Sequence, residues 1–424
     1  MKALLTLAWR SAWSRRATLS LVLLSVALST FLLLGFEQVR TDVRENFSQS
    51  VSGTDLVVGA RTGSVQLMLY AVFRVGSATH NIRMSSVEAI AKHRAVDWVV
   101  PLSLGDSHRG YAVLGTTADY FKRFLYGDRE PLALVQGRAF ADGIGGLYGV
   151  VLGAEVAHAL GYQLGNKLTL THGEGGLPGA EHADKPFTVV GILQRTGTPV
   201  DRTVHISLES MEAIHIDWMG GAPMPGMVIP PEQARKFDLS PKVVTAALVG
   251  LKGRAAVFNV QRFVSDYADE PLMAVLPGVA LDELWEVVGV GEKALLGMSV
   301  MVGVVSLAGL VAVVMAGLNE RRRELAVLRA VGAAPRHVLL LLAGEGLLVT
   351  LLGALLGLLA TGLLVSMAAP WVQAHYGVML KLSAPSAHQW GLFAGVVLAG
   401  GVASLIPAWR AYMWSLADGL SPRV

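Results

Sequence analysis

Long apolar runs near both ends of the chain enclose a polar middle. Four runs hold almost no charged residues, at 17–36, 294–319, 338–367 and 390–408. A helix rises about 1.5 Å per residue, so about 20 apolar residues cross a hydrocarbon layer roughly 30 Å thick. Each run meets or closely approaches that length, and the pattern therefore predicts four transmembrane helices.

The helical pattern continues from two of these runs into the polar middle. One apolar stripe follows the first run and another precedes the second; they comprise Phe36, Val39, Val43, Phe47 and Val51, and Leu281, Leu284, Trp285 and Val288. Because an amphipathic helix packs along one side only, the two stripes predict stalks at 37–53 and 281–293.

The polar middle, 54–280, begins and ends with the same order of patterns. A strand, a helix and a strand are expected at 55–59, 85–93 and 98–104, and again at 243–251, 255–267 and 272–276. Two such β-α-β units would pair into one α+β subdomain made of 54–105 and 240–280. The glycine-rich insertion between them, 106–235, is predicted to be a β-rich subdomain.

The charged residues give these segments an orientation. The chain has a formal net charge of +3, but residues 37–293 sum to −5 and the remainder to +8. Lys and Arg mark the cytoplasmic side of a membrane. The sequence thus predicts a cytoplasmic interfacial helix at 1–16, a cytoplasmic segment at 320–337, a periplasmic loop at 368–389 and a cytoplasmic tail at 409–424.

This orientation defines the fold class. We expect a multi-pass α-helical membrane protein with four transmembrane helices and a large α+β periplasmic domain inserted between helices 1 and 2. The apolar content of 53% and mean hydropathy of +0.50 suit a chain that is part membrane and part soluble domain. Since the basic excess lies beside the spans, it favours contact with membrane lipid over nucleic acid.

The most ordered basic segment is NERRRELAVLRAVGA, from Asn319 to Ala333. Acidic residues precede basic ones, two leucines recur at helical spacing, and a glycine followed by Pro335 supplies a stop. A short surface helix that docks on a partner is predicted. Its docking residues would be Glu320, Arg321, Arg322, Arg323, Glu324, Leu325, Leu328, Arg329 and Gly332.

This segment also carries a family resemblance. The pattern E-R-R-R-E-x-A-x-L-R-A-x-G-A resembles the cytoplasmic signature of the FtsX/MacB/LolC-like (type VII) ABC transporter permeases. PAWRAYMWSLADGL, from Pro407 to Leu420, resembles the closing motif of that family, and LAWRSAWSRRATLSLVLLSVALS, from Leu7 to Ser29, its opening.

The resemblance implies a permease subunit that transmits the ATP-driven motion of a separate cytoplasmic ATPase to its own periplasmic domain. It implies an ABC ATPase dimer and a second permease copy as partners, with the docking residues above as the ATPase coupling site. It also implies a place in the bacterial inner membrane with both termini cytoplasmic. The expected client is periplasmic or in the outer membrane: a lipoprotein, a lipid, a peptide or a metal-binding protein.

The sequence offers no catalytic motif. It contains no G-x-x-x-x-G-K-[ST] phosphate loop, no H-E-x-x-H, G-x-S-x-G or S-x-x-K pattern, and no cysteine. These motifs supply the usual nucleophiles and metal ligands of hydrolases. The chain is therefore not expected to be an enzyme or to hold a cofactor; ATP and magnesium would lie on the partner ATPase.

The third apolar run holds one acidic residue, Glu345. An ionisable group inside a span is a functional candidate by default. Glu345 lies about two turns past the cytoplasmic end of its run, where pairing with Arg329 or Arg336 would give it a structural role. Small residues in the same run favour close helix packing; they are Gly344, Gly346, Gly353, Ala354 and Gly357.

Histidine is the remaining candidate chemistry, because eight of the 11 histidines lie in the polar middle. His172 and His182 bracket a loop that also contains Glu174, Glu181 and Asp184. Imidazole suits zinc or copper, but this spacing fits no known ligand template. No metal site is assigned, and His172 and His182 are named as metal candidates only.

Two alternatives to a client-directed permease stay open. The histidines are compatible with zinc- or metal-linked small-solute transport. The family resemblance is also compatible with non-transport signalling across the membrane to a cell-wall hydrolase.

Overall fold

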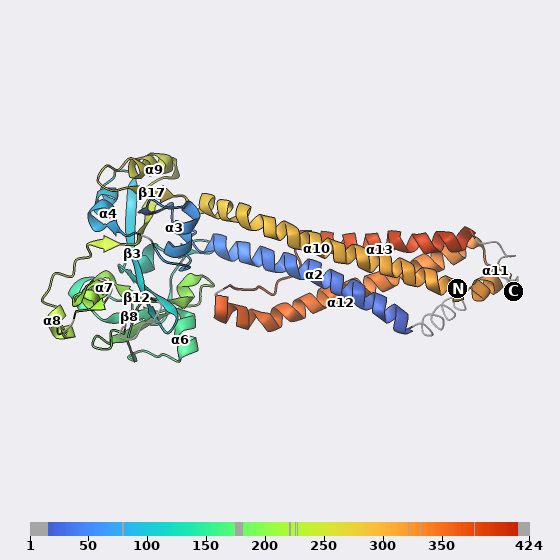
Figure 1. The fold of residues 1–424 in the computed structure, drawn as a ribbon, viewed down its shortest axis with the longest axis horizontal. Helices are drawn as coiled ribbons and strands as arrows, with labels where there is room; N and C mark the ends of the chain where they lie inside the picture. Colours follow the sequence, from blue (N-terminus) through green and yellow to red (C-terminus); the bar gives the residue numbers. More distant parts are fainter. Residues whose placement is uncertain are drawn as a thin grey trace. The chain divides into compact units, whose positions relative to one another are not determined.

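The structure, a computed structural model, describes residues 16–78, 80–173, 181–219, 222–224, 226, 228–320, 322–330, 332–376 and 378–413. It divides into two compact units (Figure 1). The helical unit comprises Met1–Asp42, Gly289–Trp371 and Leu380–Val424, and the sheet unit comprises Val43–Val288 and Val372–Met379. Each unit is described by itself below.

Four long helices supply the helical unit in the described part of the chain: α2 (Arg16–Gln49), α10 (Pro277–Glu320), α12 (Pro335–Tyr376) and α13 (Ala387–Met413). All four are long and apolar enough to cross a membrane. Helix α2 has 34 residues and α10 has 44, so they extend about 50 and 65 Å, well past the ~30 Å of a hydrocarbon core. Helix α10 covers the whole of 281–293, whereas α2 ends at Gln49, four residues before the end of the stalk predicted at 37–53.

Glycines allow α12 to approach its neighbours closely. A Cβ added at Gly357 would lie 2.5 Å from the backbone oxygen of Ala27 in α2, and one at Gly353 would lie 2.9 Å from Cβ of Val26. Gly346 faces Ser404 of α13 in the same way, whereas Gly344 has nothing within 4 Å of such a Cβ. Close packing at small residues, as the sequence predicts, holds for the first three of these glycines.

A short helix, α11 (Arg322–Ala330), connects α10 to α12. Leu325 is buried there, in a cluster with Leu318 of α10 and Val338 of α12. Gly332 has a φ of +103°, a conformation that favours glycine, and α12 then begins at Pro335. The segment predicted at 320–337 thus holds α11 and the start of α12, and Leu325 fixes α11 to the chain's own helices.

The sheet unit is built on an 11-stranded sheet within the described residues. At one end the order is β17 (Leu272–Val275), β1 (Leu56–Ala60), β16 (Ala246–Leu251) and β3 (Val96–His108), and all neighbours are antiparallel. Strands from the start and the end of the polar region therefore alternate. They form one continuous antiparallel part of the sheet.

Apolar side chains on both faces of β1 explain why helices cover both faces of this end of the sheet. Leu56 and Val58 join a core with Val260 of α9 (Val257–Ser265) and with α4 (Met84–Ala91). Val57 points to the opposite core, formed with α3 (Ser64–Ala71), a helix that the sequence analysis did not predict. Successive strand residues face opposite sides, so each face needs its own helical cover.

The insertion continues the same sheet. Strand β3 runs across the predicted boundary at 105 and turns into β4 (Tyr111–Thr116) through Arg109 and Gly110, which have φ of +48° and +85°. Two consecutive residues with positive φ form a two-residue hairpin turn whose twist matches the right-handed twist of the two strands that it joins. Beyond β4 follow β12 (Thr203–Ser207), β8 (Gly149–Leu152), β11 (Phe187–Leu193) and β7 (Leu134–Gly137), with β9 (Lys167–Leu168) on β11 and β10 (Thr171–His172) on β3.

Helices α6 (Ala154–Leu160) and α7 (Leu208–His215) accompany the inserted strands. Val156 of α6 and Ile214 of α7 enter the core of this part. The smaller elements are β2 (Ile82–Arg83), α5 (Tyr120–Arg123), β5 (Leu125–Tyr126), β6 (Glu130–Pro131), η1 (Gly143–Gly146), η2 (Pro199–Arg202), β13 (Trp218–Met219), β14 (Ala222–Pro223), α8 (Pro231–Ala234), β15 (Val243–Val244) and η3 (Arg254–Ala256).

Residues 372–379 also belong to the sheet unit, although the sequence predicts a loop over 368–389. Helix α12 continues to Tyr376, and the side-chain amide of Asn46 then bonds both backbone groups of Met379, at 2.9 and 3.2 Å. Met379 packs against Gly197, whose φ of +73° and lack of a side chain leave room for it. The end of α12 is thus docked on the sheet unit.

Candidate metal centre

Four potential metal ligands meet in the sheet unit: Asp106, His172, His182 and His215. They come from β3, from the end of β10, from the segment after residue 180 and from the last residue of α7. One ligand atom from each residue lies within 4.8 Å of all the others. Residues far apart in the sequence therefore form one compact cluster.

Strand pairing places Asp106 and His172 opposite each other. Strand β10 pairs antiparallel with β3, with His172 as the partner of Asp106. The pairing of β3 with β4 shifts register between Leu104 and Ser107, which inserts an extra residue into β3 beside Asp106. Such a bulge bends a strand and redirects a side chain, and here the carboxylate of Asp106 is directed at the histidines.

Helix α7 brings His215 to the same point. Ser207 caps the helix start by accepting a hydrogen bond from the backbone N–H of Ser210 at 3.1 Å. At the other end, Nδ1 of His215 lies 2.9 Å from the backbone oxygen of Met211. A proton on Nδ1 that is donated to this carbonyl leaves Nε2 as a lone pair facing the cluster.

Three of the ligand atoms form a nearly regular triangle. Nδ1 of His172 lies 3.0 Å from Oδ1 of Asp106 and 3.0 Å from Nε2 of His215. The third side, from Nε2 of His215 to Oδ1 of Asp106, is 3.4 Å. The side chain of Asp106 is 0% exposed, whereas those of His172 and His215 are 35% and 27% exposed. The triangle is closed on the carboxylate side and reachable on the histidine side.

His182 completes the group and is itself fully buried. Its ring centroid lies 4.9 Å from that of His215 and 4.4 Å from the indole of Trp218. Neither ring nitrogen of His182 has a hydrogen-bond partner among the described residues, and neither does Oδ2 of Asp106. Buried polar atoms without partners are costly, so this concentration of them needs an explanation.

The charges of the cluster shift its pKa values. Burial alone would raise the pKa of Asp106, but hydrogen bonds from His172 and His215 outweigh it and lower that pKa to about 2. Burial lowers the pKa of His182 to about 4, against the attraction of Asp106. For His215, burial acts to lower the pKa, but the hydrogen bond and charge of Asp106 raise it overall. Asp106 is therefore ionised and His182 neutral near pH 7, as metal ligands must be, whereas the raised pKa of His215 favours a protonated ring that must lose its proton to bind a metal.

A buried ion pair holds the segments that carry His182 and His215. The ammonium of Lys185 bonds the two carboxylate oxygens of Asp217 at 2.8 and 2.7 Å, and their side chains are 0% and 5% exposed. Asp217 also accepts a hydrogen bond from the backbone N–H of Ile229 at 3.1 Å. The ligands thus stand on a scaffold that is fixed by groups outside the cluster.

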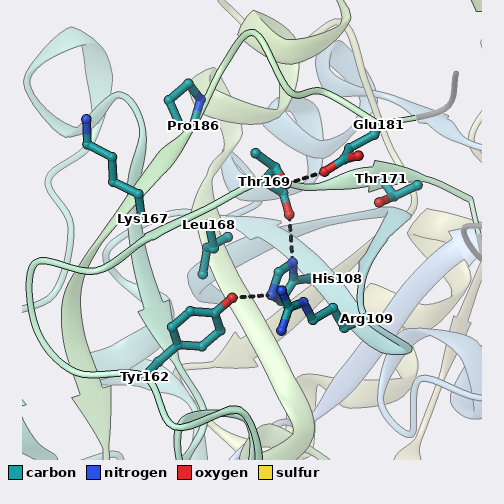
Figure 2. A pocket seen from close by; sticks show the side chains of 9 residues that line it. All are labelled: His108, Arg109, Tyr162, Lys167, Leu168, Thr169, Thr171, Glu181 and Pro186. Atoms are coloured by element: carbon teal, nitrogen blue, oxygen red, sulfur yellow. Dashed lines mark hydrogen bonds between the residues drawn. The ribbon is translucent and has the colours of Figure 1, made fainter.

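A polar pocket of about 220 Å³ is lined by residues adjacent to the cluster in sequence (Figure 2). His108 is its central side chain: Nδ1 lies 2.6 Å from the backbone oxygen of Thr169, and Nε2 lies 3.0 Å from the hydroxyl of Tyr162. The hydroxyl of Thr169 donates to Glu181 at 2.6 Å. Because both nitrogens of His108 are already bonded, the pocket presents no histidine lone pair to a ligand.

The structure brings the two metal candidates from the sequence, His172 and His182, into one site. Of the acidic residues in the same loop, Glu181 bonds Thr169 and Asp184 bonds Lys185, and Glu174 lies outside the described residues. Sequence reasoning missed Asp106 and His215. No local spacing connects them to His172; only the pairing of β10 with β3 and the end of α7 do.

The predicted coupling residues are described in part. Arg321 lies outside the described residues, as do the side chains of Glu320, Arg322, Arg323, Glu324 and Leu328. Arg329 is half-buried on α11, Gly332 forms the turn before α12, and Glu345 is half-buried on α12. Leu325 packs inside the helical unit, as described above.

Four apolar helices with a large α+β domain inserted after the first define a class of membrane permeases. Two family models match the chain: the MacB-like periplasmic core domain over residues 17–232 and the FtsX-like permease C-terminal region over residues 296–413. The chain belongs to this MacB/FtsX-like family of ABC transporter permeases. Its members are membrane components that are not themselves catalytic and that normally pair with a cytoplasmic ATPase.

Two solved structures are similar over the inserted domain. The periplasmic region of MacB from Actinobacillus actinomycetemcomitans has 12% identity, a TM-score of 0.35, and coverage of 56% of this chain and 95% of that one. The extracellular domain of the noncanonic ABC-type transporter YknZ from Gram-positive bacteria has 13% identity, a TM-score of 0.28, and coverage of 46% and 89%. No curated protein sequence matches the chain.

Proposed function

We propose that this chain transmits ATP-driven motion from a cytoplasmic ATPase to its sheet unit, which acts on a periplasmic client. The observation that carries the proposal is the continuity of three helices. The boundary between the units falls inside α2, α10 and α12, and each of these helices continues on both sides of it. In α12, Pro370 lies beside the boundary and removes one backbone hydrogen bond there. A helix carries a displacement along its length, because its backbone hydrogen bonds resist a sharp bend.

The ends of these helices are held firmly inside the sheet unit. Phe47 of α2 stacks on Phe73 with ring centroids 4.4 Å apart, and it meets Trp285 of α10 edge-on at 5.6 Å. Arg44 lies over the Trp285 ring at 5.1 Å. Together with the Asn46 bonds to Met379, these contacts would pass a shift of any of the three helices into the sheet.

The family and the distribution of charge support a proposed cellular setting. We place the chain in the bacterial inner membrane with both termini cytoplasmic, paired with a second permease copy and with an ATPase dimer that docks on 320–337. Four spans per chain offer little room for a wide channel, so work on a lipoprotein, lipid, peptide or metal-binding protein is favoured over passage of a solute.

A charge reversal tests the docking site. Replacing Arg321, Arg322, Arg323 and Arg329 by glutamate should abolish co-purification of the ATPase, because the variant repels the surface that the arginines attract. Membrane insertion should persist, as judged by extraction of the full chain only with detergent. The matched control is Arg254→Glu with Arg262→Glu in the sheet unit, which should retain the ATPase.

A second change tests transmission separately from docking. Asn46→Ala removes both bonds to Met379 and should leave the ATPase bound while reducing the client-dependent change in ATPase rate. Retention of the complex by the arginine variant, or full client response in the Asn46 variant, would contradict the respective step.

A further inference from the structure

We propose that Asp106, His172, His182 and His215 bind one divalent first-row transition-metal ion, for which zinc is the best match. The proposal goes beyond the transmission role, and it would stand without that role. It rests on the spacing of the ligand atoms, on the unpartnered polar atoms of the cluster and on the kinds of donor present.

The spacing fits a tetrahedral site. Zinc binds imidazole nitrogen and carboxylate oxygen at about 2.0–2.2 Å, so ligand atoms of a regular tetrahedron lie about 3.3–3.6 Å apart. The three measured edges among Asp106, His172 and His215 are 3.0, 3.0 and 3.4 Å. One face of the tetrahedron is therefore almost formed, and only a small expansion is needed to admit the ion.

The hydrogen bonds of the cluster do not explain its geometry. When His215 is neutral, Nδ1 of His172 approaches two acceptors, and a single proton cannot serve both of them fully. His182 is 0% exposed and neither of its nitrogens has a partner among the described residues. One bound ion would accept the lone pairs of all three imidazoles and an oxygen of Asp106 at once.

The donor set selects the class of ion. Three imidazole nitrogens and one carboxylate suit zinc, copper, nickel or cobalt, whereas calcium and magnesium require oxygen ligands. Tetrahedral coordination favours zinc over copper(II) and nickel, which prefer square-planar or tetragonal geometry. Four protein ligands also leave no open position for a substrate, which is typical of a structural rather than a catalytic site.

The site is built in advance and can be entered. The bond from His215 to the backbone of Met211 fixes one ligand ring, and the Lys185–Asp217 pair fixes the segments that carry His182 and His215. His172 and His215 remain partly exposed, so an ion can arrive from that side. Once bound, it would join β3, β10, α7 and the segment after residue 180 to one another.

The test is a zinc titration of the full-length chain in detergent, after treatment with a chelator, in competition with a chromophoric chelator. We expect one tight ion per chain, and His172→Ala should weaken binding at least tenfold. This side chain is half-exposed, so its removal leaves the fold intact. Asp106→Asn keeps the shape and removes the charge, and should weaken binding as well. His158→Ala, an exposed histidine on α6, is the matched control and should bind like the parent chain.

A spectroscopic readout locates the ion. Cobalt(II) in place of zinc should give the intense visible absorption of a tetrahedral site, and it should quench Trp218, which lies against three of the ligand rings. Trp218→Phe should abolish most of the quenching while cobalt still binds. Binding that is unchanged in both ligand variants, or quenching that persists without Trp218, would overturn the proposal.

Discussion

Strand β3 supplies one residue to each of two neighbouring histidine environments, which differ in the hydrogen bonding of the ring nitrogens. At His108, both ring nitrogens are hydrogen-bonded, to the backbone of Thr169 and to Tyr162. At His182, which is more deeply buried, neither nitrogen has a partner in the described part of the chain. Burial alone therefore does not distinguish a structural histidine from a metal ligand.

His205 shows that an unpartnered nitrogen is not sufficient either. It is fully buried, its Nδ1 lies 3.3 Å from the backbone oxygen of Val151, and its Nε2 has no partner among the described residues. Its neighbours are the rings of Tyr120 and Phe121, and it joins no ligand cluster in the described chain. A metal site needs several unpartnered donors converging on one point.

The largest expected effect comes from the scaffold behind the metal centre. Lys185→Met leaves the carboxylate of Asp217 buried without its counter-charge, and breaking such a pair costs about 3–5 kcal/mol. We expect a loss of that size in the free energy of unfolding, measured by urea titration of the full-length chain. Because the ligands then lose their support, zinc affinity should also fall, by roughly 10–100-fold.

A double variant distinguishes the effect of losing the ion pair from the effect of replacing the lysine side chain. With Lys185→Met and Asp217→Asn together, no charge is buried and the bond from Ile229 is kept. Most of the lost stability should return. A single variant as stable as the parent chain would show that the pair does not hold this region.

The same substitution at the two histidines should have opposite effects. His108→Phe removes two hydrogen bonds and strands their partners, which costs about 1–3 kcal/mol. His182→Phe removes two unpartnered buried nitrogens and should leave the metal-free chain equally stable, or more stable by about 1 kcal/mol. Zinc should raise the melting temperature of the His108 variant and not that of the His182 variant. Equal losses in the free energy of unfolding for His108→Phe and His182→Phe would contradict the proposed difference between the two histidines.

The smallest expected effect is the pH dependence of the unfolding free energy that His205 causes. Burial lowers the pKa of His205 to about 3, whereas an unfolded histidine titrates near 6.5. The unfolded chain therefore binds the extra proton first as pH falls, and the stabilisation is present above pH 6.5 and lost between about 6.5 and 3. Between pH 7 and pH 5 this loss is on the order of 2 kcal/mol. His205→Leu should make the unfolding free energy less dependent on pH over that range, and an unchanged dependence would contradict the burial.

Local patterns were sufficient to predict the parts of the fold that depend on local order. The apolar runs gave the four long helices, and the repeated strand-helix-strand order gave the interleaved end of the sheet. The boundary at 105 could not be seen, because the hairpin at Arg109 and Gly110 joins the insertion to the same sheet. The loop predicted at 368–389 was also too long, since only docking on Asn46 and Gly197 shows that 372–379 belongs to the sheet unit.

Only part of the metal centre could be predicted from the sequence. His172 and His182 stood out because they bracket one loop, but their spacing matched no template. Asp106 becomes a ligand through a strand pairing and a bulge, and His215 through the length of α7; both depend on tertiary structure. The one local signal was the histidine at the end of an amphipathic helix, which is too common to indicate a metal site by itself.

The metal content of the purified protein tests the central claim most directly. The full-length chain, expressed with added zinc and purified in detergent through a tag that uses no metal, would be compared by elemental analysis with His172→Ala. The account predicts one zinc ion per chain in the parent protein and a small fraction of that in the variant. Absence of metal from the parent protein, or equal amounts in both, would contradict it.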